Sequence, residues 1–315
     1  MSCWTFITAS GPSSFNRPLY NEGTRVNIQK SYQNDNGKGK LYLVGTPIGN
    51  LEDITFRAIR VLKEVQLIAA EDTRQTRKLL THYDISTRLV SYHEHNKQAS
   101  GPELIRLMMA GESIALVSDA GLPAICDPGA DLVRQAVEAG VDVIPIPGAN
   151  AALSALIISG LPTDRFTFLG FLPRDRKPLL EELRSLQHVK DTLIFYESPH
   201  RIEKTLEAML ETWNPERRIC LIRELTKKYE EAVRGTVKEC SELLKEQPPQ
   251  GEYCIVVEGV TAAEQTAAAD WWEAFSPEEH VEHYEAQGLD RKESIKRAAT
   301  DRRIPKRELY NYLHK

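Results

Sequence analysis

Short apolar runs alternate with helically spaced apolar positions over residues 41 to 160 of the chain. The runs predict buried strands and read LYLV (41–44), QLIAA (66–70), LVSY (89–92), SIALVS (113–118) and VDVIPI (141–146). After the first run, helical spacing predicts a helix with Asp53 as its N-cap; its apolar positions are Phe56, Ile59, Leu62 and Val65. Strands that alternate with helices in this way predict a mainly parallel sheet with both faces covered.

The second half of the chain shows a different arrangement of strands. These strands are expected at FTFLGFLP (166–173), DTLIFYESP (191–199), RICLIREL (218–225), EEAVRGTV (230–237) and GEYCIVVEG (251–259), with helices over 199–213 and 238–246. Two pairs of strands are close enough along the chain to be antiparallel neighbours, which predicts a mixed sheet. We therefore expect an α/β protein with two domains, 40–150 and 151–260, after a polar, aperiodic and disordered extension over 1–39.

The C-terminal end of the chain is basic, although the whole protein has a net charge of −5. A linker of small residues (261–276) precedes a tail (277–315), in which nine Lys and Arg residues outnumber three Asp and Glu residues from position 291 onward. Asp290 with Glu293 resembles a capping box, and Pro305 suits the first turn of a second helix. The tail therefore resembles a helix-turn-helix; the alternative is a solvated helical cap.

Cysteine and proline usage exclude several classes of protein. The five cysteines form no CxxC pair, which argues against a disulfide framework or a zinc knuckle and favours the reducing cytoplasm. We expect all five to be buried thiols. The nearly uncharged stretch 141–162 is broken by Pro145, Pro147 and Gly148, so it predicts a strand, a turn and a helix and no membrane span.

Three loops at strand ends are candidates for a ligand site: LVGTPIGNLED (43–53), SDAGLPAICDPG (118–129) and PIPGANAA (145–152). The first loop has neither a GxGxxG pattern nor a Gly-Lys-Ser/Thr tripeptide, so a dinucleotide fingerprint and a P-loop are both excluded. In a parallel sheet the three loops gather at the carboxyl edge, and in the second and third loops only Asp119 and Asp127 bring charge. Such a pocket suits a cationic or zwitterionic ligand with a ribose for a carboxylate to hold.

Ordered motifs carry a resemblance to a known family; they are YLVGTPIGNLEDITFRA, AAEDTR, SYHEHN, SDAGLPAICDPG, PIPGANAALSAL, FLGFLPR, YESPHRI and RELTKKYEE. Over about residues 40 to 315, the chain resembles the bacterial 16S rRNA (cytidine(1402)-2′-O)-methyltransferases of the tetrapyrrole methylase superfamily. The resemblance implies a class III methyltransferase fold with two α/β domains, a homodimer, and S-adenosylmethionine bound between the domains. The sulfonium of this donor suits a first loop without Lys or Arg. Thr46-Pro47-Ile48 replaces the GxGxG of many superfamily members, which fits the rRNA branch.

The resemblance also implies roles for individual residues. The donor site is expected at Thr46, Pro47, Ser118, Asp119, Ala120, Gly121, Leu122, Pro123, Pro147, Gly148, Ala149, Asn150, Ala151, Tyr196 and Glu197. Candidates for proton handling at the ribose hydroxyl are Glu71, Asp72, His93, Glu94 and His95. Contacts to 16S rRNA in the small subunit are expected from Arg74, His200, Arg201, Arg302, Arg303, Lys306 and Arg307, with Arg223, Lys227 and Lys228 as further cleft residues.

Each of these functional roles has a purely structural alternative. An acid pair such as Glu71-Asp72 at a strand end often only caps the next helix. The HEH motif has i, i+2 spacing and no evident third ligand, so we expect no metal. Two other functions also remain open: methylation of a small molecule such as a precorrin, and a ligand-sensing regulator whose basic tail binds DNA.

Overall fold

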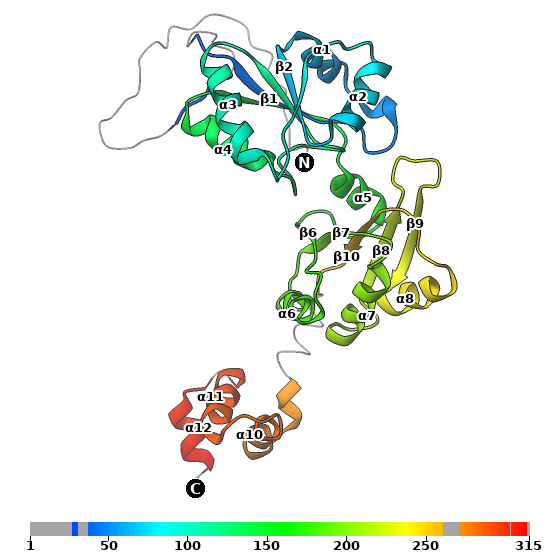
Figure 1. The fold of residues 1–315 in the computed structure, drawn as a ribbon. Coiled ribbons are helices and arrows are strands. Elements are labelled where there is room, and N and C mark those ends of the chain that lie inside the picture. Colours follow the sequence, from blue (N-terminus) through cyan, green and yellow to red (C-terminus); the bar gives the residue numbers. More distant parts are fainter. Residues whose placement is uncertain (1–26, 31–36, 261–270, 303, 314–315) are drawn as a thin grey trace, which may run out of the picture.

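The computed structural model describes residues 27–30, 37–260, 271–302 and 304–313. Figure 1 shows two successive α/β units and a small group of helices at the C-terminal end. This arrangement confirms the predicted fold class. Residues 1–26 and 31–36 of the predicted extension, 261–270 of the predicted linker, and Arg303 lie outside the described part of the chain.

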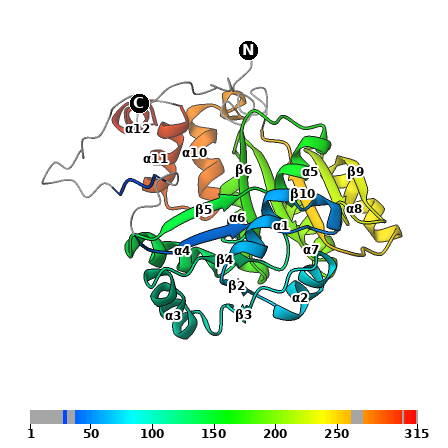
Figure 2. The same ribbon diagram turned by 90° about the horizontal axis from the view of Figure 1, so that it is seen from above.

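The first sheet is parallel and has the strand order β3-β2-β4-β1-β5. Its strands are β1 (Lys40–Val44), β2 (Leu67–Ala70), β3 (Leu89–Ser91), β4 (Ile114–Val117) and β5 (Asp142–Ile146). One face packs against α1 (Phe56–Glu64) and α2 (Thr73–His82), and the other against α3 (Lys97–Met109) and α4 (Gly129–Glu138). Figure 2 shows α3 and α4 together on one side of the sheet. Because both faces are covered, β2 and β4 are buried at every position.

The start of α1 differs from the prediction. Asp53 is not the N-cap, because residues Leu51–Asp53 form a short 3-10 helix instead. Thr55 is the N-cap, and its hydroxyl accepts a hydrogen bond from the Ala58 N–H at 3.1 Å. The expected core position Phe56 is 95% exposed, since the helix turns Ala58, Val61 and Leu62 toward the sheet.

The second sheet is mixed, as the sequence predicted, with the order β6-β7-β10-β8-β9. Only the β6–β7 pair is parallel among the described strands of this sheet. The elements are α5 (Ala151–Ser159), β6 (Phe166–Phe171), α6 (Arg176–Leu186), β7 (Thr192–Glu197), α7 (Ile202–Thr212), β8 (Arg218–Arg223), β9 (Glu231–Thr236), α8 (Val237–Glu246) and β10 (Tyr253–Val257). Helix α5 covers one face, and α6, α7 and α8 cover the other.

We call the described residues from 271 onward the C-terminal module. It contains a 3-10 helix η2 (Trp271–Ala274) and the helices α10 (Pro277–Ala286), α11 (Arg291–Asp301) and α12 (Lys306–Leu313). Asp290 caps α11 as expected, by accepting from the Glu293 N–H at 2.9 Å. The three helices share a small core of Val281, Ile295, Ala298, Ala299 and Leu309, so the two predicted helices pack on a third.

The cysteines correct one expectation. Cys220, Cys240 and Cys254 are buried free thiols, but Cys126 is exposed; Cys3 lies outside the described residues. Burial raises the pKa of Cys240 and of Cys254 to about 12, so both thiols stay protonated at neutral pH. In the described parts of the chain, no helix is long and apolar enough to cross a membrane.

Candidate active site

The three predicted loops meet at the carboxyl edge of the first sheet. Thr46 and Gly121 exchange two backbone hydrogen bonds, of 2.9 Å from the Thr46 N–H and 3.1 Å from the Gly121 N–H. A Cβ on Gly45 would lie 2.9 Å from the Cα of Gly148, which is closer than side chains tolerate. The loops therefore touch backbone to backbone, and the close approach requires glycine at positions 45 and 148.

A cavity of about 540 Å³ lies between these loops and the second sheet. This volume is in the range of about 300–1,000 Å³ that is typical of small-molecule sites. From the first half of the chain it is lined by Ile48, Glu71, Ser118, Asp119, Ala120, Gly121, Leu122, Ile125, Cys126, Asp127, Asn150 and Ala151. From the second half it is lined by Phe171, Tyr196, Glu197, Ser198, Ile222, Glu224, Leu225, Lys227, Glu252, Tyr253 and Cys254.

Tyr196 joins the two halves of the cavity wall. Its hydroxyl accepts a hydrogen bond from the Ala152 N–H at 3.2 Å, and its ring packs edge-on against Phe168 and Phe171. Burial raises the pKa of Tyr196 to about 12, so the phenol is neutral at physiological pH. The neighbouring Glu197 is only 2% exposed, and its carboxylate accepts from the Thr205 hydroxyl at 2.8 Å.

Three carboxyl groups gather on the other wall. Burial, together with the charges of Asp119 and Asp127, raises the pKa of Glu71 above its usual range. Burial also raises the pKa of Asp127, whose carboxylate accepts from the backbone N–H groups of Ala124 and Gly129. Asp119 accepts from the Asp72 N–H at 2.9 Å and so ties this loop to the end of β2. The wall therefore carries three carboxyl groups, and Glu71, which lines the cavity and has a raised pKa, is the candidate proton acceptor.

The other proton-handling candidates lie outside the cavity lining. Asp72 caps α2 and is bonded to Arg74, which lowers the pKa of Asp72 to about 2. Glu94 is exposed and pairs with Lys97 at 2.8 Å. His95 is also exposed, and its ring packs against that of His93 at 6.0 Å between centroids.

His93 differs from His95 in that one of its ring nitrogens is buried. Its Nδ1 is buried without a hydrogen-bond partner among the described residues, and its charge acts on Glu71. No group of three His, Cys, Asp or Glu side chains within the described residues is placed to hold a metal ion.

Comparisons with known proteins narrow the interpretation. The tetrapyrrole (corrin/porphyrin) methylase family matches residues 40–241. Ribosomal RNA small subunit methyltransferase I of Halalkalibacterium halodurans is 56% identical over 289 residues, which cover 92% of this chain and 99% of the relative. The protein of the same name from Bacillus subtilis is 53% identical, over 91% of this chain and 98% of its own. The chain belongs to the tetrapyrrole methylase family, in the branch of these relatives.

Solved structures with low identity share the tetrapyrrole methylase fold. Diphthine synthase has a TM-score of 0.56 with 15% identity, and covers 71% of this chain and 91% of its own. A cobalt precorrin-4 methyltransferase has a TM-score of 0.54 with 19% identity, and covers 70% of this chain and 94% of its own. These likenesses concern the fold alone, because the identities are low.

The structure brings most of the expected donor residues of this tetrapyrrole methylase into one cavity. Ser118 to Leu122, Asn150, Ala151, Tyr196 and Glu197 line it, whereas Thr46, Pro47, Pro123, Pro147, Gly148 and Ala149 are not among the lining residues. Thr46 instead holds two loops together, since it is 3% exposed and its backbone is hydrogen-bonded to that of Gly121. Of the lining from the second half of the chain, Tyr196 and Glu197 were expected donor residues and Lys227 an expected cleft residue, and the rest was missed. The RELTKKYEE motif was the available signal for Glu224 and Leu225.

Several side chains expected to contact RNA instead bond within the protein: Arg74 pairs with Asp72 at 3.0 Å, and Lys306 donates to the carbonyl of Lys292 at 3.1 Å. Arg201 donates to the carbonyls of Leu172 and Pro173, at 3.0 and 2.8 Å. Arg302 donates to the carbonyl of Phe275 at 2.5 Å and stacks on Trp272. Other candidates lie at the surface: His200 and Arg307 are exposed.

A second cavity of about 430 Å³ adjoins the first. It lies between the first loop and α2, and its lining includes Pro47, Gln75 and Lys78. Ser118 and Asp119 line both cavities, so the two spaces meet at these residues. A reaction between two bound molecules requires such an arrangement.

Proposed function

We propose that this protein transfers a methyl group from S-adenosylmethionine to the ribose 2′-hydroxyl of a cytidine, cytidine 1402, in 16S rRNA of the small ribosomal subunit. The names of the relatives, ribosomal RNA small subunit methyltransferase I, support this acceptor. The observation that carries the proposal is the meeting of the two cavities at Ser118 and Asp119. One cavity has the size and lining for the methyl donor, and the lining of the other includes the basic residue Lys78.

The residues of the larger cavity fit S-adenosylmethionine. The donor, which supplies a methyl group activated by a positive sulfur, needs negative surroundings and no phosphate site. Glu71, Asp119 and Asp127 provide negative charge. Lys227 is already paired with Glu224 at 2.9 Å and leaves little free positive charge in the lining. The main chain around Gly121 and apolar side chains such as Ile125 offer a surface for the flat adenine.

Positioning supplies most of the rate in such a reaction. Well-aligned reactants gain about 7–11 kcal/mol over reactants free in solution. The 2′-oxygen forms the new bond to the methyl carbon while the carbon–sulfur bond breaks, and the hydroxyl proton must leave. We assign that proton to the Glu71 carboxylate, because Glu71 lines the cavity and has a raised pKa. A positive charge on the nearby His93 would lower the pKa of Glu71 and so favour the carboxylate form.

The proposal includes a cytoplasmic homodimer. Ribosomal RNA is a cytoplasmic substrate in bacteria, and the resemblance implies two subunits. Exposed apolar side chains on α5, namely Leu153 at 47% and Ile157 at 74%, are suited to be covered by a second copy. Light scattering coupled to gel filtration of the full chain measures the mass, and a monomer at micromolar concentration would contradict the dimer.

Label transfer separates this function from its rivals. The full chain is incubated with methyl-labelled S-adenosylmethionine and, in parallel, with 30S subunits, a porphyrinoid mixture or duplex DNA. We expect label in 16S rRNA alone. Label in a porphyrinoid would establish small-molecule methylation, and DNA binding without label in any acceptor would establish a sensor.

A further inference from the structure

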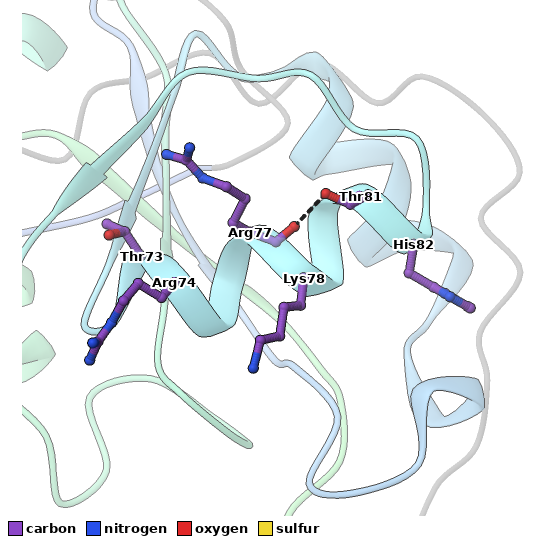
Figure 3. Close-up of a pocket in the computed structure, with 6 residues that line it drawn as sticks. All are labelled: Thr73, Arg74, Arg77, Lys78, Thr81 and His82. Carbon is purple, nitrogen blue, oxygen red and sulfur yellow. Dashed lines mark hydrogen bonds between the residues drawn. The ribbon is translucent and has the colours of Figure 1, made fainter.

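Helix α2 carries three cations next to the proposed active site: Arg74, Arg77 and Lys78, which we call the α2 basic surface. All three side chains are exposed and line an open hollow of about 760 Å³. In Figure 3, Arg74 and Lys78 extend to one side of the helix and Arg77 to the other. At 3.6 residues per turn the three lie within about a third of the helix circumference. The three cations therefore form a band of positive charge around this one hollow, with side chains on both sides of the helix.

Little negative charge in the protein compensates this band. Arg74 pairs with Asp72 at 3.0 Å. Lys78 donates to the amide oxygen of Gln75 at 3.0 Å, which leaves its charge unneutralised. For the guanidinium of Arg77, the described residues offer no hydrogen bond or ion pair; only its backbone carbonyl accepts, from the Thr81 hydroxyl at 2.8 Å. Two of the three cations are therefore available to an external anion.

The position of the surface distinguishes it from an ordinary solvated helix face. Lys78 also lines the second cavity, whose lining includes Asp119. Asp119 in turn lines the donor cavity. A polyanion held on α2 would thus have a path through the second cavity to the methyl donor. The hydrogen bond from Asp72 N–H to Asp119 fixes the start of α2 against this junction.

We propose that the α2 basic surface binds the phosphates of the RNA strand beside the target cytidine, and so directs the 2′-hydroxyl to Asp119 and Glu71. This inference rests on the proposed function and adds a docking surface to it. Phosphate contacts fix register and orientation without reading sequence, as this task requires. The C-terminal module would capture the subunit at a distance, whereas α2 would place the reactive nucleotide.

The test compares two doubly substituted full-length proteins with the same change in charge. Arg77→Gln with Lys78→Gln removes the two available cations of the surface. Lys238→Gln with Lys245→Gln is the control, because both lysines are exposed on α8 and line neither cavity. The measurements are donor affinity by calorimetry, binding of a labelled 16S fragment at several salt concentrations, and methylation of 30S subunits.

We expect the α2 variant to keep donor affinity and to bind RNA at least tenfold more weakly than the control. The slope of log K against log salt should flatten by about 1.4, since each lost single-strand phosphate contact contributes about 0.7. RNA affinity and slope equal to those of the control would overturn the surface, while wild-type methylation of 16S rRNA would leave the proposed function standing. Slower methylation of 30S subunits by the α2 variant without weaker binding to the 16S fragment would also overturn it, and would indicate a ribosomal protein as the partner. Failure of the wild type both to bind the 16S fragment and to methylate 30S subunits would overturn both proposals.

Discussion

Gly121 and Gly160 offer a matched pair of substitutions that locates the methyl donor. Both glycines have left-handed backbones, with φ of +77° and +76°. Alanine at such a position costs about 1–2 kcal/mol for L-residues. Gly121 lines the proposed donor cavity of about 540 Å³. Gly160 follows the last residue of α5, and an added Cβ there would meet nothing within 4 Å. The two variants therefore carry the same strain in different places.

The consequences should differ at the cavity. An alanine Cβ at 121 would lie 3.4 Å from Ile48 and 3.6 Å from the carbonyl of Ala149, so space alone permits it. Relief of the strain instead requires the backbone to rotate away from φ +77°, which breaks the two hydrogen bonds with Thr46. If binding of the donor must restore that geometry, the penalty of about 1–2 kcal/mol appears as weaker binding. At 1.4 kcal/mol per tenfold, this is a loss of about 5- to 30-fold.

Calorimetry with S-adenosylmethionine and urea unfolding of both variants check the reasoning. We expect both variants to lose similar stability and only Gly121→Ala to lose donor affinity. A donor Kd for Gly121→Ala within twofold of wild type, with the expected loss of stability, would remove the donor from this cavity. Weaker donor binding by Gly160→Ala would show that strain anywhere in the fold has the same effect.

Four further predictions concern the proton acceptor and the C-terminal module. Glu71→Gln should lower turnover by roughly 10²-fold at unchanged donor affinity, whereas Asp72→Asn should lower it little; equal losses would refute the assignment. Because the folded-state pKa of Glu71 is raised, its ionisation destabilises the protein as pH rises, so Glu71→Gln should gain stability relative to wild type at pH 8 but not at pH 4, measured by urea unfolding. Arg302→Leu should destabilise the module by roughly 1.5–3 kcal/mol through lost charged hydrogen bonds. Removal of residues 277–315 should raise the 30S concentration for half-maximal rate and flatten the salt dependence of that concentration. A truncated protein that cannot bind the donor would instead show that the module is a structural cap.

The convergence of the three loops could be predicted from the sequence, because alternating strands and helices force the strand ends to one edge. The α6 helix was missed, although Leu179, Leu183 and Leu186 show a helical spacing and are buried. Pro178 within this segment suits the first turn of a helix, but reads in a sequence as a break. The start of α1 was misplaced because Asp53 and Thr55 are both good N-caps two positions apart.

The chemistry of single side chains depended on contacts far apart in the sequence. Nothing near Arg302 in the chain shows that its guanidinium reaches Phe275, 27 residues away. The hydrogen bond from the Asp72 N–H to the Asp119 carboxylate spans 47 residues and joins the start of α2 to a loop that lines the cavity. Glu71 and Asp72 are neighbours in the sequence, yet the pKa of one is raised and that of the other lowered. Burial and partners separate them, and neither is visible in a motif.

The central claim is ribose methylation of a cytidine in 16S rRNA. Its most direct test is mass spectrometry of nucleosides from 16S rRNA fragments around cytidine 1402, prepared from 30S subunits of a strain lacking this protein. The subunits are treated with S-adenosylmethionine and either the wild-type protein or Glu71→Gln. We predict that the wild type adds one methyl group to the ribose of cytidine 1402 and that the variant adds it far more slowly. A methyl group on the base, on another nucleotide, or on no nucleotide would contradict the account.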